Sequence, residues 1–178
     1  MSQTTEISRP YLLDDVDLRI VAVLQEDASI QNQELARRVH LSQAPCLRRV
    51  RRLKDEGIIK QTVALIDAAR LGLTVEVYAF IALENQRTAS GQQFESMLRR
   101  RPEVLECVRL SGAYDYLLRV VVPSIEAYSA FIDRYVLSLS AIRSVNSSFG
   151  LGILKRTTAL PLPGPRRRQR SRGIGKAS

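Results

Sequence analysis

The sequence is poor in the residues that bind metals and perform nucleophilic chemistry. Its 178 residues include one histidine, His40, and two cysteines, Cys46 and Cys107. Cys107 lies far from the other two in the sequence, and three residues cannot alone supply the four ligands of a usual zinc site. A lone histidine with scattered serines and aspartates gives no credible catalytic triad. We therefore expect no metal and no other cofactor.

Long apolar runs are also missing. No stretch approaches the roughly eighteen apolar residues that a membrane helix needs. Residues 1–13 do not have the charged and then apolar layout of a secretion signal. These absences favour the cytoplasm, where both cysteines are expected to be free thiols. The hydrophobic content of 45% predicts a folded core, and the length fits one large domain or two small ones.

The net charge of +9 is unevenly distributed. Acidic residues dominate positions 1–36, whereas positions 37–60 hold eight basic and two acidic residues, and positions 161–178 hold six basic residues and no acid. A basic segment inside an ordered region is typical of a surface that binds a polyanion. The alternative interpretation is a solvated helix face without a partner.

Residues 14–26 have the pattern of an amphipathic helix. Asp14 can act as the N-cap, Asp17 follows three residues later, and acids in the first turn suit the helix dipole. The expected buried stripe follows helical spacing and consists of Val16, Ile20, Val23 and Leu24.

Two further helices are predicted over about 32–39 and 43–56, separated by only three residues. Ser42 is expected to cap the second of them, and Gly57 is expected to end it. A pair of helices joined by so short a turn, with the second strongly basic, has the layout of a helix-turn-helix.

A helical wheel divides the basic helix into two faces. The apolar side holds Leu47, Val50 and Leu53, with Cys46 toward it, and the opposite side holds Ala44, Pro45, Arg48 and Arg52. Small residues allow a helix end to approach base edges, and arginines reach guanine or phosphate. The candidates for base edges are Arg48 and Gln43, with Ala44 at the point of close approach, and the candidates for phosphates are Ser42, Arg49 and Arg52.

Residues 58–66 are expected to form two short strands that fold back on the helices as a wing. The predicted DNA-binding domain then covers residues 12–70, after an N-terminal extension at 1–11.

The second half of the sequence has a different hydrophobic periodicity. Apolar residues alternate at period two over 75–83, which predicts a strand with one buried face. A helix over 90–101, stopped by Pro102, is followed by strands at 104–110 and 116–122, a helix capped by Ser124, and a final strand at about 145–155. The stripe expected on the helix after Ser124 is Ile125, Tyr128, Phe131, Ile132, Tyr135 and Val136.

This order is the split βαβ pattern of a ferredoxin-like sandwich, which we assign to residues 71–160. The fold class is therefore α+β. Helices on one face of the sheet leave the other face bare, and a second subunit normally covers such a face, so at least a homodimer is expected. Residues 161–178 are too poor in apolar residues to fold and are expected to be a disordered basic tail.

The chain resembles the Lrp/AsnC (feast/famine) family of prokaryotic transcriptional regulators over about residues 12–160. Four stretches carry the resemblance: LDDVDLRIV at 13–21, ELARRV at 34–39, LSQAPCLRRVRRLKDEGII at 41–59 and SGAYDYLL at 111–118. The resemblance implies a winged helix-turn-helix that reads operator DNA. It also implies a βαββαβ domain that dimerises, assembles further into tetramers or octamers, and binds an amino acid or related small molecule between dimers.

The family's effector loop corresponds to Ser111, Gly112, Ala113, Tyr114 and Asp115. By this resemblance, Gly112 would let the backbone approach a ligand, and Asp115 would meet an α-amino group or order the loop. The alternative is a plain β-turn between two strands.

Two positions depart from the family pattern. His40 stands where many relatives have glycine, and histidine tolerates a left-handed backbone better than most residues. Gln31 stands where a Ser or Thr cap is usual, which makes Asn32 the expected cap of the second helix.

Two other functions fit this two-domain architecture. One is a decarboxylase acting on sirohaem, which would need histidines in the C-terminal domain, where the sequence has none. Cys107 is likewise expected in the core rather than as a nucleophile. The other is a sensor that has lost DNA binding, which the basic helix argues against. A regulator without enzymatic activity is the favoured interpretation.

Overall fold

The computed structural model describes residues 13–84 and 89–163. They form two compact units: unit 1 contains residues 13–64 and 157–163, and unit 2 contains residues 65–156. The expected extension at 1–11, and the predicted basic tail beyond residue 163, lie outside the described residues. No helix in the described part of the chain is long and apolar enough to span a membrane.

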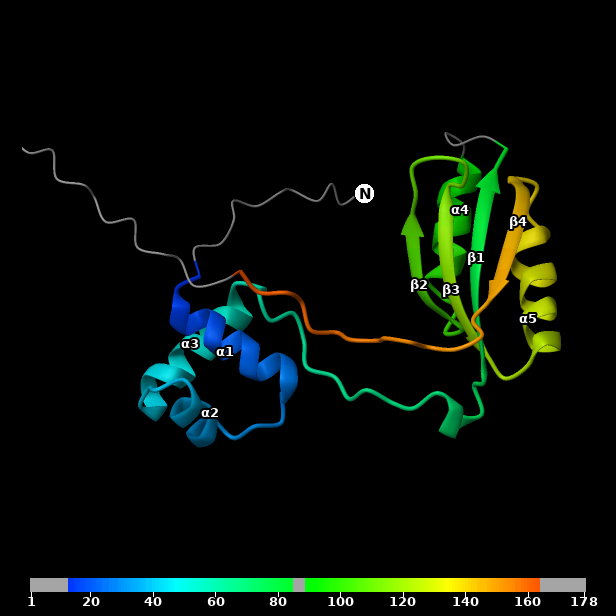
Figure 1. Ribbon diagram of the computed structural model, residues 1–178. Coiled ribbons are helices and arrows are strands. Elements are labelled where there is room, and N and C mark those ends of the chain that lie inside the picture. The colour runs from blue at the N-terminus through cyan, green and yellow to red at the C-terminus, as the bar shows by residue number, and fades with distance from the viewer. Residues whose placement is uncertain (1–12, 85–88, 164–178) are drawn as a thin grey trace, which may run out of the picture. The chain divides into compact units, whose positions relative to one another are not determined.

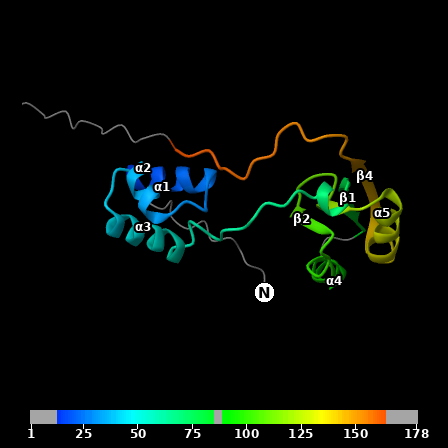
Figure 2. The same ribbon diagram turned by 90° about the horizontal axis from the view of Figure 1, so that it is seen from below.

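Unit 1 consists of three helices, shown in Figures 1 and 2. The expected capping box opens the first one: the Asp14 carboxylate accepts from the Asp17 amide at 2.8 Å, and the Asp17 carboxylate accepts from the Asp14 amide at 3.2 Å. The helices are α1 (Asp15–Glu26), α2 (Asn32–Arg38) and α3 (Gln43–Asp55).

The core of unit 1 is small. Its fully buried apolar side chains come from all three helices and from the turn after α2. Of the stripe expected on α1, only Ile20 is fully buried, while Val16, Val23 and Leu24 pack at the margin. The buried apolar residues are Ile20, Leu35, Ala36, Val39, Cys46 and Leu53.

The cap of α3 is at the predicted residue, whereas the cap predicted for α2 was wrong. Ser42 occupies the N-cap position of α3, but its side chain makes no capping hydrogen bond. The N-cap of α2 is Gln31, which also makes none. Asn32 is the first residue inside α2, and its amide group donates to the Gln43 carbonyl at 3.1 Å. Asn32 therefore ties the start of α2 to the start of α3 instead of capping its own helix.

The predicted strands of the wing are absent from residues 58–66 in the structure. Gly57 adopts the expected positive φ of 71° after α3. The Ile59 amide then donates to the Leu53 carbonyl at 2.9 Å, and Ile58 and Ile59 pack on the core of unit 1. Residues 60–66 are exposed, and no other described segment pairs with them as a strand. Apolar residues alone do not form a ladder without a partner strand.

Unit 2 is a four-stranded antiparallel sheet with the order β2-β3-β1-β4 (Figure 1). This is the predicted ferredoxin-like arrangement. A 3-10 turn, η1 (Ala69–Leu71), precedes the sheet, and α5 continues into a π-helical turn, η2 (Asp133–Leu137). The elements are β1 (Val75–Leu83), α4 (Ala89–Leu98), β2 (Val104–Arg109), β3 (Tyr116–Val122), α5 (Ile125–Ile132) and β4 (Ile142–Phe149).

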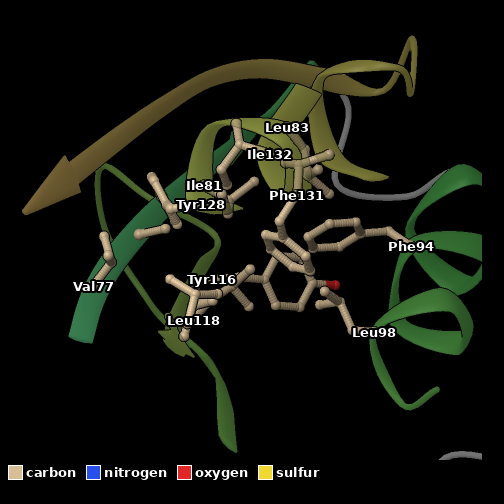
Figure 3. Packing of buried hydrophobic residues seen from close by; sticks show 14 residues of the cluster. Val77, Ile81, Leu83, Phe94, Leu98, Tyr116, Leu118, Tyr128, Phe131 and Ile132 are labelled. Carbon is tan, nitrogen blue, oxygen red and sulfur yellow. The ribbon is translucent and has the colours of Figure 1, made fainter. Parts of the chain in front are cut away.

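The core of unit 2 lies between the sheet and its helices. Figure 3 shows Phe94 and Leu98 of α4 pointing toward residues of β1, β3 and α5. Ser124 caps α5 as expected, since its hydroxyl accepts from the Ala127 amide at 3.2 Å. Ile125 was wrongly placed in the buried stripe: it is 59% exposed because it stands in the first turn of α5.

The last strand begins and ends earlier than expected. β4 stops at Phe149, which pairs with Val77 near the start of β1. The Gly150 amide still donates to the Glu76 carbonyl at 2.8 Å, one residue from the start of β1 at Val75. The chain then continues without a strand to residue 163.

The described part of the C-terminal segment is bonded to unit 1 through Gln25 and Leu160. The Gln25 side chain on α1 donates to the Leu160 carbonyl at 3.2 Å and accepts from the Leu160 amide at 2.6 Å. These two bonds satisfy the backbone of Leu160 as a neighbouring strand would.

Candidate DNA-binding surface and effector loop

α3 buries one face against α1 and α2. Cys46 and Leu53 are completely buried and Val50 lies between them at the margin of the core. Leu47, which was expected on the buried side, is 38% exposed. Positions 46, 50 and 53 follow the helical i, i+4, i+7 spacing, so Cys46 occupies the place that the wheel gave to Leu47.

The opposite face of α3 is open. Ser42, Gln43, Ala44 and Arg48 are all exposed at or near its N-terminal end. A hollow on this helix is lined by Pro45, Arg48, Arg49 and Arg52. Among the described residues, Arg48 makes no ion pair. The small residues therefore precede the arginines along an accessible surface, as the sequence predicted.

Arg49 and Arg52 are already paired within unit 1. Arg49 Nη1 donates to Asp14 Oδ2 at 2.6 Å and to Asp17 Oδ1 at 2.8 Å, and Arg52 Nη2 donates to Asp17 Oδ2 at 2.5 Å. Asp17 is only 1% exposed. The hydrogen bonds to Asp14 and Asp17 raise the pKa of Arg49. This pairing was not predicted, although two acids lie one turn apart at the start of α1 and two arginines lie one turn apart on α3.

The turn between α2 and α3 is fixed by the backbone. His40 has a φ of 58°, so it adopts the left-handed conformation expected for it. Its amide donates to the Arg37 carbonyl at 3.2 Å, and the Leu41 amide donates to the Ala36 carbonyl at 2.9 Å. These bonds satisfy the end of α2 and set the direction in which α3 leaves the turn.

One carboxylate compensates one of the two positive charges of α2. The Glu34 carboxylate binds Arg37 at 2.8 Å and Arg38 at 3.0 Å. Hydrogen bonds from Arg37 and then Arg38 lower the pKa of Glu34 to about 2. The uncompensated positive charge of this region therefore belongs mainly to α3.

The predicted effector loop connects β2 to β3. Gly112 has a φ of 131°, and a Cβ built there would meet nothing within 4 Å, so backbone conformation rather than crowding requires glycine. The Asp115 carboxylate accepts from the Leu83 amide at 2.7 Å, and the Asp115 amide donates to the Ile81 carbonyl at 2.8 Å. Asp115 thus orders the loop by extending the pairing between β1 and β3.

Tyr114, within this loop, packs on the sheet. Its ring packs against Phe80 of β1 with 5.3 Å between centroids, and its hydroxyl accepts from the Asn146 amide group at 3.4 Å. Ser111, Gly112 and Ala113 remain exposed. Tyr114 and Asp115 are therefore held by contacts with the sheet, whereas residues 111–113, the loop tip, are accessible.

A cluster of charges that the sequence analysis did not identify lies near the start of β1. The Glu76 carboxylate accepts from Tyr78 at 2.8 Å, from Arg119 at 2.7 Å and from Arg156 at 2.5 Å. Burial alone would raise the pKa of Glu76, but the bonds from these three residues lower it to about 2. Register pairs Glu76 with Val121, so only the folded sheet brings Arg119 to it.

Cys107 is exposed, which corrects the expectation that it belongs to the core. It lies on β2, an edge strand that has a neighbour on one side only. Desolvation and then Glu95 raise the pKa of its thiol, which disfavours the reactive thiolate. Across the described ranges, no three potential metal ligands of the His, Cys, Asp and Glu types come together.

Each of the two units matches a known protein family. Residues 13–60 match a winged helix-turn-helix DNA-binding family, and residues 76–160 match the Lrp/AsnC ligand binding domain. The DNA-binding transcriptional activator DecR of Escherichia coli K12 is 36% identical over 151 residues, which cover 85% of this chain and 99% of DecR. The leucine-responsive regulatory protein of Klebsiella pneumoniae is 34% identical, with 83% of this chain and 90% of that protein covered.

Solved structures give the same result. A transcriptional regulator from Neisseria meningitidis, crystallised with L-Met, has a TM-score of 0.80 and 37% identity, with 84% of this chain and 96% of that chain covered. An AsnC family regulator from Agrobacterium tumefaciens has a TM-score of 0.79 and 39% identity, with 84% and 97% covered. The chain therefore belongs to the Lrp/AsnC family and is a DNA-binding transcriptional regulator.

Proposed function

We propose that α3 is the helix that reads operator DNA. Arg48 is the main candidate for a base edge, with Gln43 beside it and Ala44 allowing close approach. Ser42, Arg49 and Arg52 flank this set as candidates for phosphate contacts. The observation that carries the proposal is the exposure of Arg48 on an open helix face, without an ion-pair partner among the described residues.

Arg48→Ala tests this proposal. The operator is first selected from random duplexes with the wild-type protein, and affinity is then measured by fluorescence anisotropy. We expect a loss of about 1 to 3 kcal/mol on the operator, because one base contact disappears. Arg70→Ala is the matched control, since Arg70 is 88% exposed, lies in unit 2 and carries the same charge. Equal affinities of the two variants would remove Arg48 from the reading surface.

The second part of the proposal is that an amino acid or related metabolite binds at the loop Ser111–Asp115. Two similarities support it: one related structure contains L-Met, and one relative is leucine-responsive by name. The exposed loop tip beside Tyr114 offers backbone groups that a small polar ligand can approach. The Asp115 carboxylate accepts a hydrogen bond from the Leu83 amide, so we assign it a role in ordering the loop.

Calorimetric titration with L-methionine and L-leucine tests the effector. Ala113→Arg places a long side chain on the loop tip, so we expect it to abolish the heat of binding seen with wild type. Ala69→Arg introduces the same side chain at an exposed position outside the loop and should bind normally. Retained binding in Ala113→Arg, or no binding by wild type to either amino acid, would contradict this part of the proposal.

We also propose a homodimer that assembles further into a tetramer or octamer, and the outer face of the sheet supports the dimer. Register places Phe80, Leu117 and Val108 on the face that points away from the core. An apolar face of this kind is normally covered by a second subunit. We further propose that the regulator acts in the cytoplasm and has no enzymatic activity, since the histidine that tetrapyrrole chemistry would need in unit 2 is missing.

A further inference from the structure

The pairing of α1 with α3 places acidic groups where a DNA phosphate would otherwise bind. Arg49 and Arg52 are one turn apart on α3, and both guanidinium groups donate to carboxylates of α1 at 2.5 to 2.8 Å. Carboxylate and phosphate oxygens are equivalent partners for an arginine, because both accept charge-assisted hydrogen bonds from its planar fork.

These arginines are not sealed from solvent. The Arg52 side chain is 46% exposed and the Arg49 side chain is 29% exposed, and both line the hollow on α3 together with Arg48. A phosphate can therefore reach them, but it must displace Asp14 or Asp17. Asp17 is the stronger competitor because it is 1% exposed and binds both arginines through its two oxygens.

We propose that Asp14 and Asp17 compete with DNA phosphates for Arg49 and Arg52 and thereby limit the affinity of α3 for DNA of any sequence. The inference rests on the proposed role of α3 in reading DNA. Asp17 is then a positioning residue: it leaves Arg48 available for base contacts while it withholds two cations from indiscriminate phosphate binding. Discrimination between operator and random DNA increases as a result, because random DNA depends almost entirely on phosphate contacts.

The test compares Asp17→Asn with Asp15→Asn in the full chain. Asp15 is exposed, lies on the same helix and makes no ion pair among the described residues, so this control removes the same charge without releasing an arginine. Affinity for a random-sequence duplex is measured by anisotropy between about 50 and 300 mM KCl. Each phosphate contact adds about 0.9 to the slope of log affinity against log salt concentration.

We expect Asp17→Asn to bind random DNA more tightly than Asp15→Asn at low salt, with a slope steeper by about 1 to 2, and to show a smaller ratio of operator to random affinity. A merely structural role of Asp17 would weaken binding to both DNAs and would not steepen the slope. Equal slopes for folded Asp17→Asn and Asp15→Asn would overturn the inference.

Asp14→Asn keeps the inference testable if Asp17→Asn does not fold, because Asp14 is 50% exposed and releases Arg49 only in part. Its slope should lie between that of wild type and that expected for Asp17→Asn. A slope equal to that of Asp15→Asn would then overturn the inference. Salt-independent or absent DNA binding by the wild-type protein is a different result, since it would contradict the proposed role of α3 itself.

Discussion

Each unit is stabilised internally by a different combination of forces. Unit 2 has a core of fourteen buried residues shared by a sheet and two helices. Unit 1 has only six buried apolar residues, and its most buried polar group, Asp17, joins α1 to α3 through two arginines. Apolar packing therefore dominates in the sheet unit, whereas the helical unit depends also on ion pairs whose arginines are partly exposed.

Phe94→Ala should produce the largest effect, and it should be confined to unit 2. Phe94 is completely buried and packs edge-on against Tyr116 at 5.3 Å. Its loss leaves a cavity that costs about 3 to 5 kcal/mol. Urea unfolding should show this loss, and hydrogen exchange should accelerate in β1 and β3 but not in α2. Ile125→Ala, at a position 59% exposed, is the control and should change stability by less than about 0.5 kcal/mol.

Glu76→Gln should show that unit 2 nevertheless contains one important electrostatic contact. The folded-state pKa of Glu76 is about 2, below the ordinary value of 4.5. Its contribution is therefore complete above pH 4.5 and disappears as the pH falls toward 2. We expect Glu76→Gln to cost about 1 to 3 kcal/mol in urea unfolding at pH 7, with the difference from wild type vanishing near pH 2.

Glu84→Gln serves as the control at pH 7 because it makes the same chemical change elsewhere in unit 2. Glu84 follows β1 and is exposed. Its substitution should change the free energy of unfolding by less than about 0.5 kcal/mol. A pH-independent loss in Glu76→Gln would show that shape rather than charge matters at the start of β1.

The smallest expected effect is that of Asp14→Ala on unit 1. The substitution removes the cap of α1 and one of the two partners of Arg49. A lost N-cap costs about 1 kcal/mol. Hydrogen exchange at the start of α1 should accelerate accordingly, whereas Asp15→Ala should stay within about 0.5 kcal/mol of wild type. No change in Asp14→Ala would mean that neither its cap nor its ion pair with Arg49 contributes measurably to stability.

Local patterns predicted most of the elements correctly. The alternation at Val77, Ala79 and Ile81 identified the buried face of β1, and the capping box at Asp14 identified the start of α1. Each of these signals depends on residues close in sequence. The left-handed conformations of His40 and Gly57 followed from the same local reasoning.

The errors arose where a distant partner decides the outcome. Residues 58–66 have a suitable composition for strands but find no described strand to pair with. Asn32 bonds across to Gln43 rather than capping α2, and the paired state of Arg52 depends on Asp17, thirty-five residues earlier. Such choices depend on which groups the fold brings within hydrogen-bonding distance, and local sequence does not encode that.

The two hydrogen bonds between the Gln25 side chain and the Leu160 backbone close a large loop in the chain. The chain leaves unit 1 after residue 64 and rejoins it after residue 156, so two segments rather than one connect the units. Fixing Leu160 on α1 therefore removes conformational freedom from the second connection as well as from the residues that form the bonds.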